Sequence, residues 1–488
     1  MDGEITMEHQ LKIITRRNLL LSLALLLSLA LLLLAACGQA PCAFKVDNTE
    51  PVTPENRIIY QLNIGAFTAE GTFKAAQQQL DRLDTLGVDI VWLMPIYPRG
   101  ETMHSPYASM NFRDVNPAYG TVSDLKAFVA RAHELGMKVW LDWVPNHVAV
   151  ENPWVQEHPE YFTKDDKGQM IHPHGWGDVF ELNYRDQGLV SEMNGAMKFW
   201  ISECDVDGFR CDYVSSPTIP VSYWQDIIAQ LKTLTPKASS RGGWRGGGPI
   251  EFLSETDISN PENIRIDSCG FDYDYAWDFQ ADLAWKFRDS DKADSLRAVC
   301  EKFLKASDAI KNRRMVYLTN HDQNYNDGGH TLKDFYGDNR YALTVLQFTF
   351  YGMPLLYQGQ EIGDPDTLNY FTDAKVKWNQ VDRKMLNTVR TLVALHHSQL
   401  SLAASAPVEF ITVSSPTVLA YQRGDVLVLL NLGTSPSPVT GADIPAGQYT
   451  QWLDSQTVSD GPSAKEVTLD ANTPITLEAK GFAVYVKR

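Results

Sequence analysis

Three carboxylates in the middle of this chain stand directly after short apolar runs. They are Asp212, Glu255 and Asp322, and His321 precedes the last of them. Arg210 lies two residues before Asp212, so the two side chains share one side of an extended segment. Paired carboxylates suit acid–base chemistry, because one can hold a proton while its neighbour stays ionised. Such a pair can displace an oxygen-linked leaving group, such as a glycosidic oxygen, because one carboxyl group protonates that oxygen while the other attacks.

The segments around these residues alternate between strand and helix patterns from about residue 55 to residue 402. Eight segments favour strands, namely 58–62, 88–94, 138–143, 208–212, 250–254, 270–273, 315–318 and 354–357. Eight strand–helix units in one stretch predict a (β/α)8 TIM barrel, with a doubly wound open sheet as the alternative. In a barrel, residues at the carboxyl ends of the strands meet on one face.

Two further regions complete the predicted architecture. The connection 148–183 follows the third strand and is too long for an ordinary loop, so it is predicted as a short excursion on the active face. It carries Trp154 and Trp176, which either stack on sugar rings or anchor the excursion. Residues 403–488 hold short β-type runs separated by Gly, Ser, Pro and Asp, which predict a C-terminal antiparallel β-sandwich.

Four segments of this sequence resemble the four signature regions of the alpha-amylase superfamily, glycoside hydrolase family 13. The four segments are 142–147, 207–212, 252–255 and 317–322. Four flanking stretches also resemble the family, namely 87–95, 105–109, 116–121 and 352–361. The resemblance covers about residues 55–488. It implies a retaining glycoside hydrolase that cleaves alpha-1,4-glucosidic bonds in maltooligosaccharides or starch-like alpha-glucans.

The resemblance also implies roles for the three acids. Asp212 matches the nucleophile that forms a covalent glycosyl-enzyme. Glu255 matches the general acid, which later acts as the base on water. Asp322 matches the third carboxylate, which binds sugar hydroxyls. Asp142 matches a structural acid of the family.

Four more residues are implied as substrate-binding residues. Tyr107 matches the aromatic platform under the cleaved sugar, and His147 and His321 match imidazoles that bind its hydroxyls. Arg210 is counted with them, and its fixed charge is expected to keep Asp212 ionised. The plainer alternatives are that Tyr107 is a core aromatic and that His147 caps the excursion.

The sequence departs from the calcium-dependent amylases after Asp212. Those enzymes place a Lys-His pair a few residues after the nucleophile, whereas this chain continues with 213–216, Tyr-Val-Ser-Ser. Asn146 keeps one candidate calcium ligand, and Asp178 or Glu181 are candidates for others. The expectation is that no cofactor is required, with calcium left as a doubtful addition.

The N-terminal segment is predicted to be a signal for export. Two arginines precede the apolar run 19–34, which is short for a membrane-spanning helix. The motif Leu34-Ala35-Ala36-Cys37-Gly38 resembles the bacterial lipobox, in which the cysteine becomes the lipidated N-terminus. We therefore expect a signal peptide over 1–36, a tether over 37–54 lipidated at Cys37, and a protein anchored to a bacterial membrane on its periplasmic or cell-surface side. An uncleaved N-terminal anchor is the alternative.

The net charge excludes one class of binding partner. Sixty acidic and 43 basic residues give a net charge of −17, which is unsuited to binding the phosphate backbone of nucleic acids. The expected partner is an alpha-glucan or maltooligosaccharide. Two other functions stay open: an alpha-glucan transglycosylase on the same scaffold, and a non-catalytic glucan-binding protein. The second is disfavoured because all three acids are present.

Overall fold

The structure is a computed structural model. It describes residues 56–234, 248–256, 268–305, 313–325, 328–364, 366–403, 407–440, 444–458, 461, 463, 465–470 and 474–488. These all lie within one compact unit, Val46–Arg488. The predicted signal peptide 1–36, the tether 37–54 and Cys37 lie outside the described residues. No helix in the described part of the chain is long and apolar enough to cross a membrane.

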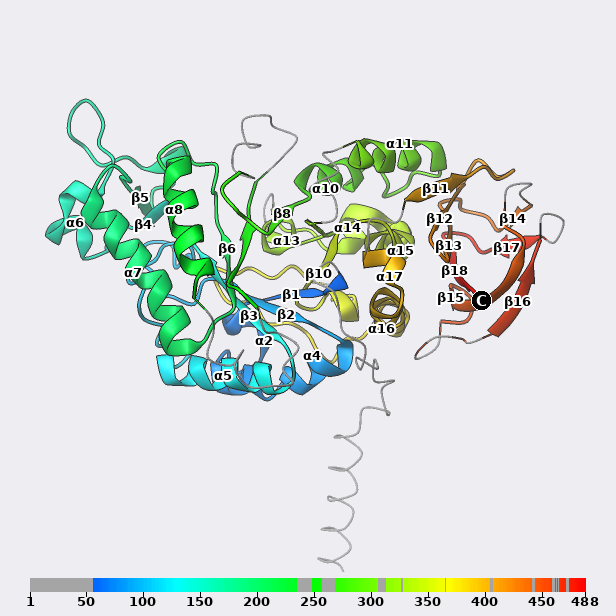
Figure 1. The fold of residues 1–488 in the computed structure, drawn as a ribbon, viewed down its shortest axis with the longest axis horizontal. Helices are drawn as coiled ribbons and strands as arrows, with labels where there is room; N and C mark the ends of the chain where they lie inside the picture. Colours follow the sequence, from blue (N-terminus) through cyan, green and yellow to red (C-terminus); the bar gives the residue numbers. More distant parts are fainter. Residues whose placement is uncertain are drawn as a thin grey trace, which may run out of the picture. The chain divides into compact units, whose positions relative to one another are not determined.

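Eight parallel strands close into a barrel (Figure 1). Around the barrel they run β1-β10-β9-β8-β7-β6-β3-β2, and β2 pairs with β1 again. Their bounds are β1 Ile59–Leu62, β2 Ile90–Leu93, β3 Lys138–Trp143, β6 Gly208–Cys211, β7 Glu251–Ser254, β8 Tyr273–Tyr275, β9 Arg314–Val316 and β10 Met353–Tyr357. The closed order confirms the predicted barrel and shows that the open-sheet alternative is wrong.

The sixth barrel strand lies further along the chain than predicted. The sequence places it at 270–273, whereas β8 runs from Tyr273 to Tyr275. Gly270 has φ +95° and belongs to a turn, so the ladder with β7 starts only at Tyr273, opposite Leu253. Phe271 is buried in that turn, and its apolar character imitates the start of a strand.

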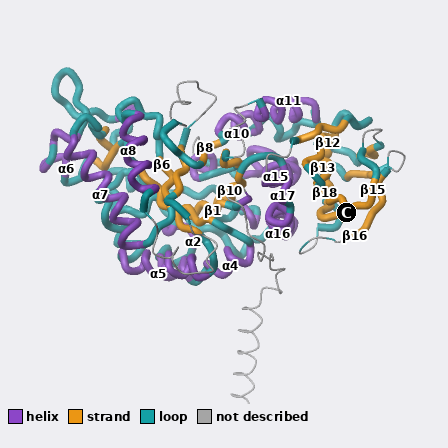
Figure 2. The backbone as a smooth tube through the Cα atoms, in the orientation of Figure 1, coloured by secondary structure: helices purple, strands orange, loops and turns teal. Residues whose placement is uncertain are grey.

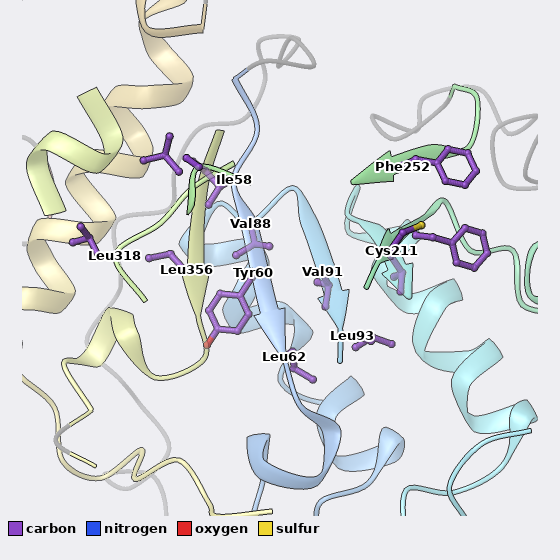
Figure 3. Close-up of a cluster of buried hydrophobic side chains, with 14 of the residues drawn as sticks. Ile58, Tyr60, Leu62, Val88, Val91, Leu93, Cys211, Phe252, Leu318 and Leu356 are labelled. Atoms are coloured by element: carbon purple, nitrogen blue, oxygen red, sulfur yellow. The ribbon is translucent and has the colours of Figure 1, made fainter. Parts of the chain in front are cut away.

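Side chains alternate between the two faces of each barrel strand, so the strands contribute to two hydrophobic cores, one inside the barrel and one outside it. Ile59 and Trp92 point into the barrel, where they meet other large side chains such as Trp140. Tyr60 and Val91 point outward into the main hydrophobic cluster, which Figure 3 shows around β1 and β2. Every barrel strand is fully buried, as expected for a parallel sheet covered by helices.

Helices flank the barrel strands (Figure 2). The helix α5 shows how the sequence sets one: Thr121 and Asp124 form a capping box at its start, and its inner face buries Leu125, Phe128 and Ala132. The helices are α2 Ile64–Phe67, α3 Phe73–Gln77, α4 Leu80–Leu86, α5 Val122–Glu134, α6 Trp154–Glu157, α7 Gln187–Cys204, α8 Val221–Lys232, α10 Trp277–Leu283, α11 Ala293–Leu304, α13 His321–Tyr325, α14 Leu332–Tyr336, α15 Arg340–Thr349, α16 Arg383–Ser398 and α17 Leu400–Ala403.

The chain leaves the barrel after β3 and forms a small excursion. Its base is an antiparallel pair, β4 His147–Ala149 with β5 Val179–Glu181. Between them lie α6 and the 3-10 turns η2 Pro159–Tyr161 and η3 Pro173–Gly175. The excursion thus starts at His147, on the carboxyl side of β3 where a barrel places its active face.

A C-terminal domain follows α17. Its six-stranded antiparallel sheet has the order β11-β12-β13-β18-β15-β16, and a second pair joins β14 to β17. The bounds are β11 Val408–Ile411, β12 Val418–Arg423, β13 Val426–Asn431, β14 Ser437–Val439, β15 Gly447–Asp454, β16 Lys465–Leu469, β17 Ile475–Leu477 and β18 Phe482–Lys487. Leu427, Leu429, Val439 and Leu477 share one buried cluster between the two sheets. The predicted antiparallel β-sandwich is confirmed.

Candidate active site

One guanidinium joins three carboxylates at the carboxyl ends of neighbouring strands. Arg210 Nη1 lies 2.8 Å from Asp142 Oδ1 and 2.8 Å from Asp212 Oδ1, and its Nη2 lies 2.6 Å from Glu255 Oε1. These contacts follow from the sheet order, because β6 lies between β3 and β7. Arg210 is fully buried and also donates from Nε to the Tyr275 hydroxyl at 3.0 Å. Arg210 therefore holds the three carboxylates in place.

Glu255 and Asp212 have different proton affinities. Burial raises the pKa of Glu255 to about 8, with the charges of Asp212 and Asp322 adding to the effect against the opposing charge of Arg210. Burial also raises the pKa of Asp212, to about 6, against the opposing charge of Arg210. Near neutral pH, Glu255 holds a proton and Asp212 has lost its own. This is the division of labour between an acid and a nucleophile.

Asp142 is held entirely by protein groups. Its Oδ1 accepts from Arg210, and its Oδ2 accepts from Trp92 Nε1 and from the Tyr107 hydroxyl, both at 3.2 Å. Its side chain is fully buried, and burial raises its pKa to about 6. These contacts fit the structural role expected for Asp142.

Tyr107 and His321 form a stacked pair. Their ring centroids are 5.3 Å apart with an interplanar angle of 15°, and the Tyr107 hydroxyl lies 2.5 Å from His321 Nε2. Gln61 Nε2 lies 2.7 Å from His321 Nδ1 and donates to it, which leaves the imidazole proton on Nε2. Burial lowers the pKa of His321 to about 4, so the ring is neutral.

The third acid and the second imidazole lie beside this pair. Asp322 is the most exposed of the three predicted catalytic acids, with 24% of its side chain accessible. His147 is buried, its Nδ1 accepts from Asn146 Nδ2 at 3.1 Å, and burial lowers its pKa to about 4. Both residues line the same cavity.

That cavity has a volume of about 650 Å³ and is lined by two of the three acids, Asp212 and Asp322. It brings together five predicted residues, namely Tyr107, His147, Asp212, His321 and Asp322. A cleft of this size, with apolar walls and a few converging polar groups, is typical of a small-ligand site. The geometry can bind a sugar, attack it with one carboxylate and protonate its leaving oxygen with another.

Comparisons with known proteins agree with this geometry. A family model described as the catalytic domain of alpha amylase matches residues 42–181. Alpha-amylase MalA of Haloarcula japonica is 27% identical over 440 residues, which cover 82% of this chain and 59% of MalA. The crystal structure of a noncanonic maltogenic alpha-amylase, AmyB from Thermotoga neapolitana, superposes with a TM-score of 0.72 at 25% identity, over 89% of this chain and 99% of AmyB. The barrel is similar to the catalytic domain of alpha-amylases.

The proteins that this chain is similar to also include a transferase. The alpha-1,4-glucan:maltose-1-phosphate maltosyltransferase of Arcanobacterium haemolyticum is 29% identical over 233 residues, which cover 42% of this chain and 31% of that enzyme. This chain spans 59% of the length of MalA.

Several residues that line the cavity belong to none of the sequence motifs. Tyr325, Tyr370 and Phe371 pack on one another at ring distances of 4.8–5.4 Å and line the cavity. Tyr370 also contacts the rings of Tyr107 and His321. The only hint in the sequence is the aromatic doublet 370–371 after the last barrel strand. Trp176 lines the cavity from the excursion, so it is more than an internal anchor.

Asn146 is the residue that the sequence offered as a calcium ligand. Its Oδ1 is buried and has no hydrogen-bond partner, which leaves one amide oxygen free to act as a ligand. Calcium takes six to eight oxygen ligands. Among the described residues, however, no group of three or more His, Cys, Asp or Glu side chains is placed to hold a metal.

Proposed function

We propose that the protein is a retaining glycoside hydrolase that cleaves alpha-1,4-glucosidic bonds in maltooligosaccharides or starch-like alpha-glucans. One observation carries the proposal: Asp212 and Glu255 contact the same buried guanidinium, that of Arg210, and Asp212 lines the cavity. The names of MalA and AmyB, an alpha-amylase and a maltogenic alpha-amylase, support alpha-glucans as the substrate class.

The reaction runs in two displacements. In the first, an Asp212 oxygen attacks the anomeric carbon while Glu255 gives its proton to the glycosidic oxygen, and the C–O bond breaks. In the second, the Glu255 carboxylate takes a proton from water, the water oxygen attacks the anomeric carbon, and Asp212 leaves as a carboxylate. Two inversions retain the anomeric configuration. Asp322, His321 and His147 bind the hydroxyls of the sugar being cleaved, and Tyr107 lies under its ring.

Arg210 balances the charge through these steps. It contacts Asp212 while that residue is an anion, and Glu255 once Glu255 has lost its proton. Because Arg210 is fully buried and held by Tyr275, it provides this positive charge without moving.

The second candidate is a transglycosylase on the same scaffold. The same acids serve both reactions, and the matching maltosyltransferase supports it by its name. A non-catalytic glucan-binding protein is the third candidate. Asp212 and Asp322 line one cavity, and Asp212 shares a guanidinium with Glu255. This argues against the third candidate, because like charges buried together are costly without a catalytic use.

The test uses the chain from Ala43 onward, which contains the compact unit Val46–Arg488. Maltoheptaose is incubated with it, with and without a chelator, and product lengths and anomeric configuration are followed. We expect shorter products with the alpha configuration at early times and no effect of the chelator. Beta products would contradict the retaining mechanism, and products longer than seven units would favour the transglycosylase. No cleavage of any alpha-1,4-glucan would exclude both enzymes.

We further propose that the protein is exported and anchored to a bacterial membrane through lipid on Cys37. The lipobox-like motif ending at Cys37 supports this. In a bacterial host fed a radiolabelled fatty acid, we expect label on the full chain and its recovery with membranes, because two or more acyl chains anchor a protein stably. Cys37→Ser should abolish the label, whereas Cys42→Ser, five residues away, should keep it. Equal labelling of both variants would contradict the proposal.

A further inference from the structure

A buried carboxylate on β8 takes no part in the two displacements. Asp274 is 3% accessible, and its neighbours Tyr273 and Tyr275 belong to the cluster inside the barrel. Asp274 therefore points outward, toward the helices. Many outward positions of the barrel strands hold apolar side chains, such as Phe252 of β7 (Figure 3). A carboxylate is costly to bury in an apolar layer, so its polar contacts explain its presence there.

Two hydroxyls donate to this carboxylate. Asp274 Oδ1 accepts from Ser254 Oγ at 3.0 Å and also from Thr256 Oγ1. Ser254 lies directly opposite Asp274 in the parallel ladder, and Thr256 follows two residues later, so all three side chains share the outward side. Both hydroxyls are buried, so bulk water does not compete for the carboxylate. One oxygen thus holds two hydroxyls that stand two positions apart in the chain.

The residue between the two hydroxyls is Glu255. It follows the last residue of β7, and alternation turns its side chain inward, where Oε1 meets Arg210 Nη2 at 2.6 Å. The ladder pairs Ser254 with Asp274, and beyond that pair the contact with β8 passes to the Thr256 hydroxyl. The backbone on both sides of the general acid is therefore tied to β8 through the same carboxylate.

A buried arginine lies next to Asp274 on the other side. Arg314 of β9 is the register partner of Asp274 and is fully buried. Register partners carry their side chains on the same face of a sheet. Arg314 also contacts Asp278 of α10, so its own charge stays paired when Asp274 is replaced.

The two ends of the Glu255 side chain are held by different groups. Its carboxyl group contacts Arg210 and accepts from the Tyr213 N–H at 2.7 Å. Asp274 holds the other end, which is the backbone from which the side chain projects. Proton delivery depends on this placement, since a shift of about 1 Å in a reacting group can cost about 100-fold in rate.

We propose that Asp274 is a positioning residue, which fixes the backbone around Glu255 through Ser254 and Thr256 and so sets where the general acid delivers its proton. This rests on the proposed function, because it concerns the acid of the same reaction. Asp274 lies outside the lining of the cavity, so it acts through Glu255 and not on the sugar itself.

The experiment compares two substrates that differ in their need for an acid. Maltoheptaose loses a sugar, which requires the proton of Glu255, whereas alpha-maltosyl fluoride loses fluoride, which does not. For each substrate kcat/KM refers the first displacement to free enzyme and free substrate. The ratio of the two values, maltoheptaose over fluoride, measures the contribution of the acid. A loss of folded enzyme lowers both values equally and leaves the ratio unchanged.

We expect the double variant Ser254→Ala/Thr256→Val to lower this ratio about tenfold or more, because the acid is no longer held in place. Thr256→Val alone is nearly isosteric and removes one of the two hydroxyls. It should lower the ratio about threefold, which is half of a tenfold effect in free energy. This single variant decides the question if the double variant does not fold.

Two variants of Asp274 separate a hydrogen bond from the volume of the side chain. Asp274→Leu has no acceptor and should lower the ratio as much as the double variant. Asp274→Asn keeps an oxygen that can accept from both hydroxyls, so its ratio should stay within about twofold of the wild type. Thr344→Val is the matched control: Thr344 is buried on α15, donates to the Arg340 carbonyl at 2.7 Å and lies outside the lining of the cavity. It should leave the ratio unchanged.

A wild-type ratio in Thr256→Val and in the folded double variant, or an equal fall in Thr344→Val, would overturn the inference. So would a loss in Asp274→Asn as large as that in Asp274→Leu. In each of these cases the wild type still cleaves both substrates, so the proposed glycosidase would stand. If the wild type cleaves neither maltoheptaose nor the fluoride, the proposed function itself fails.

Discussion

Asp212→Asn should lower the turnover of maltoheptaose by about 10⁴-fold or more, the scale on which an essential nucleophile acts in a hydrolase. The amide cannot attack the anomeric carbon, so no glycosyl-enzyme forms. The fold should persist, because the Asn oxygen can still accept from Arg210 and because Arg210 keeps Asp142 and Glu255 as partners. Steady-state kinetics and thermal unfolding of the same preparation test both halves of this prediction.

Asp142→Asn is the matched control for this variant. Asp142 accepts from the same Arg210 nitrogen at the same 2.8 Å, but both of its oxygens are engaged by protein groups. Its loss should disturb the position of Arg210 and cost no more than about 10²-fold in turnover. If Asp142→Asn were as inactive as Asp212→Asn while both stayed folded, the nucleophile would be misassigned.

Asp212→Gly offers a positive test of the same role. It opens space where the carboxylate was, and azide can enter that space and attack the anomeric carbon from the same side. Glu255 still protonates the leaving oxygen, so the product should be a glycosyl azide of the beta configuration. An alpha azide, or no rescue at any azide concentration, would count against Asp212 as the attacking group.

Much of this site could be predicted because its geometry is local or follows from strand order. A spacing of two places Arg210 and Asp212 on the same side of one strand, and the two side chains form an ion pair. Parallel strands end on one face, which brings Glu255 to the same guanidinium. These relations need only the period of a strand and the topology of a barrel.

Contacts made by barrel closure could not be predicted in this way. Gln61 in β1 fixes the tautomer of His321, which lies 260 residues away at the start of α13. Tyr325, Tyr370 and Phe371 meet only because the helix α13 and the segment after β10 lie over the same opening. No spacing in the sequence encodes such pairs.

The pKa of Asp212 also could not be predicted from the sequence. Arg210 two residues away leads one to expect a low pKa, whereas burial raises it to about 6. Burial depends on how the whole barrel covers the site, and here its effect exceeds that of the neighbouring charge. The acid–nucleophile pair is therefore separated by the higher pKa of Glu255 rather than by a depressed pKa of Asp212.

Glu255→Gln should lower the turnover of maltoheptaose by about 10²–10⁴-fold, the usual contribution of a general acid. A sugar is a poor leaving group without a proton, and the amide has none to give. Fluoride leaves without protonation, so the first displacement on alpha-maltosyl fluoride should be affected far less. The Gln side chain can still accept from the Tyr213 N–H, which favours an intact fold.

The pH dependence of the same variant separates its chemical role from a structural one. In the wild type, kcat/KM should fall below pH about 6, where Asp212 gains a proton, and above pH about 8, where Glu255 loses its proton. Glu255→Gln has no proton to lose, so the alkaline fall should disappear while the acidic fall remains. A variant that merely distorted the site would keep both. An alkaline fall that persists in Glu255→Gln, or an equal loss on fluoride and on maltoheptaose, would show that another group donates the proton.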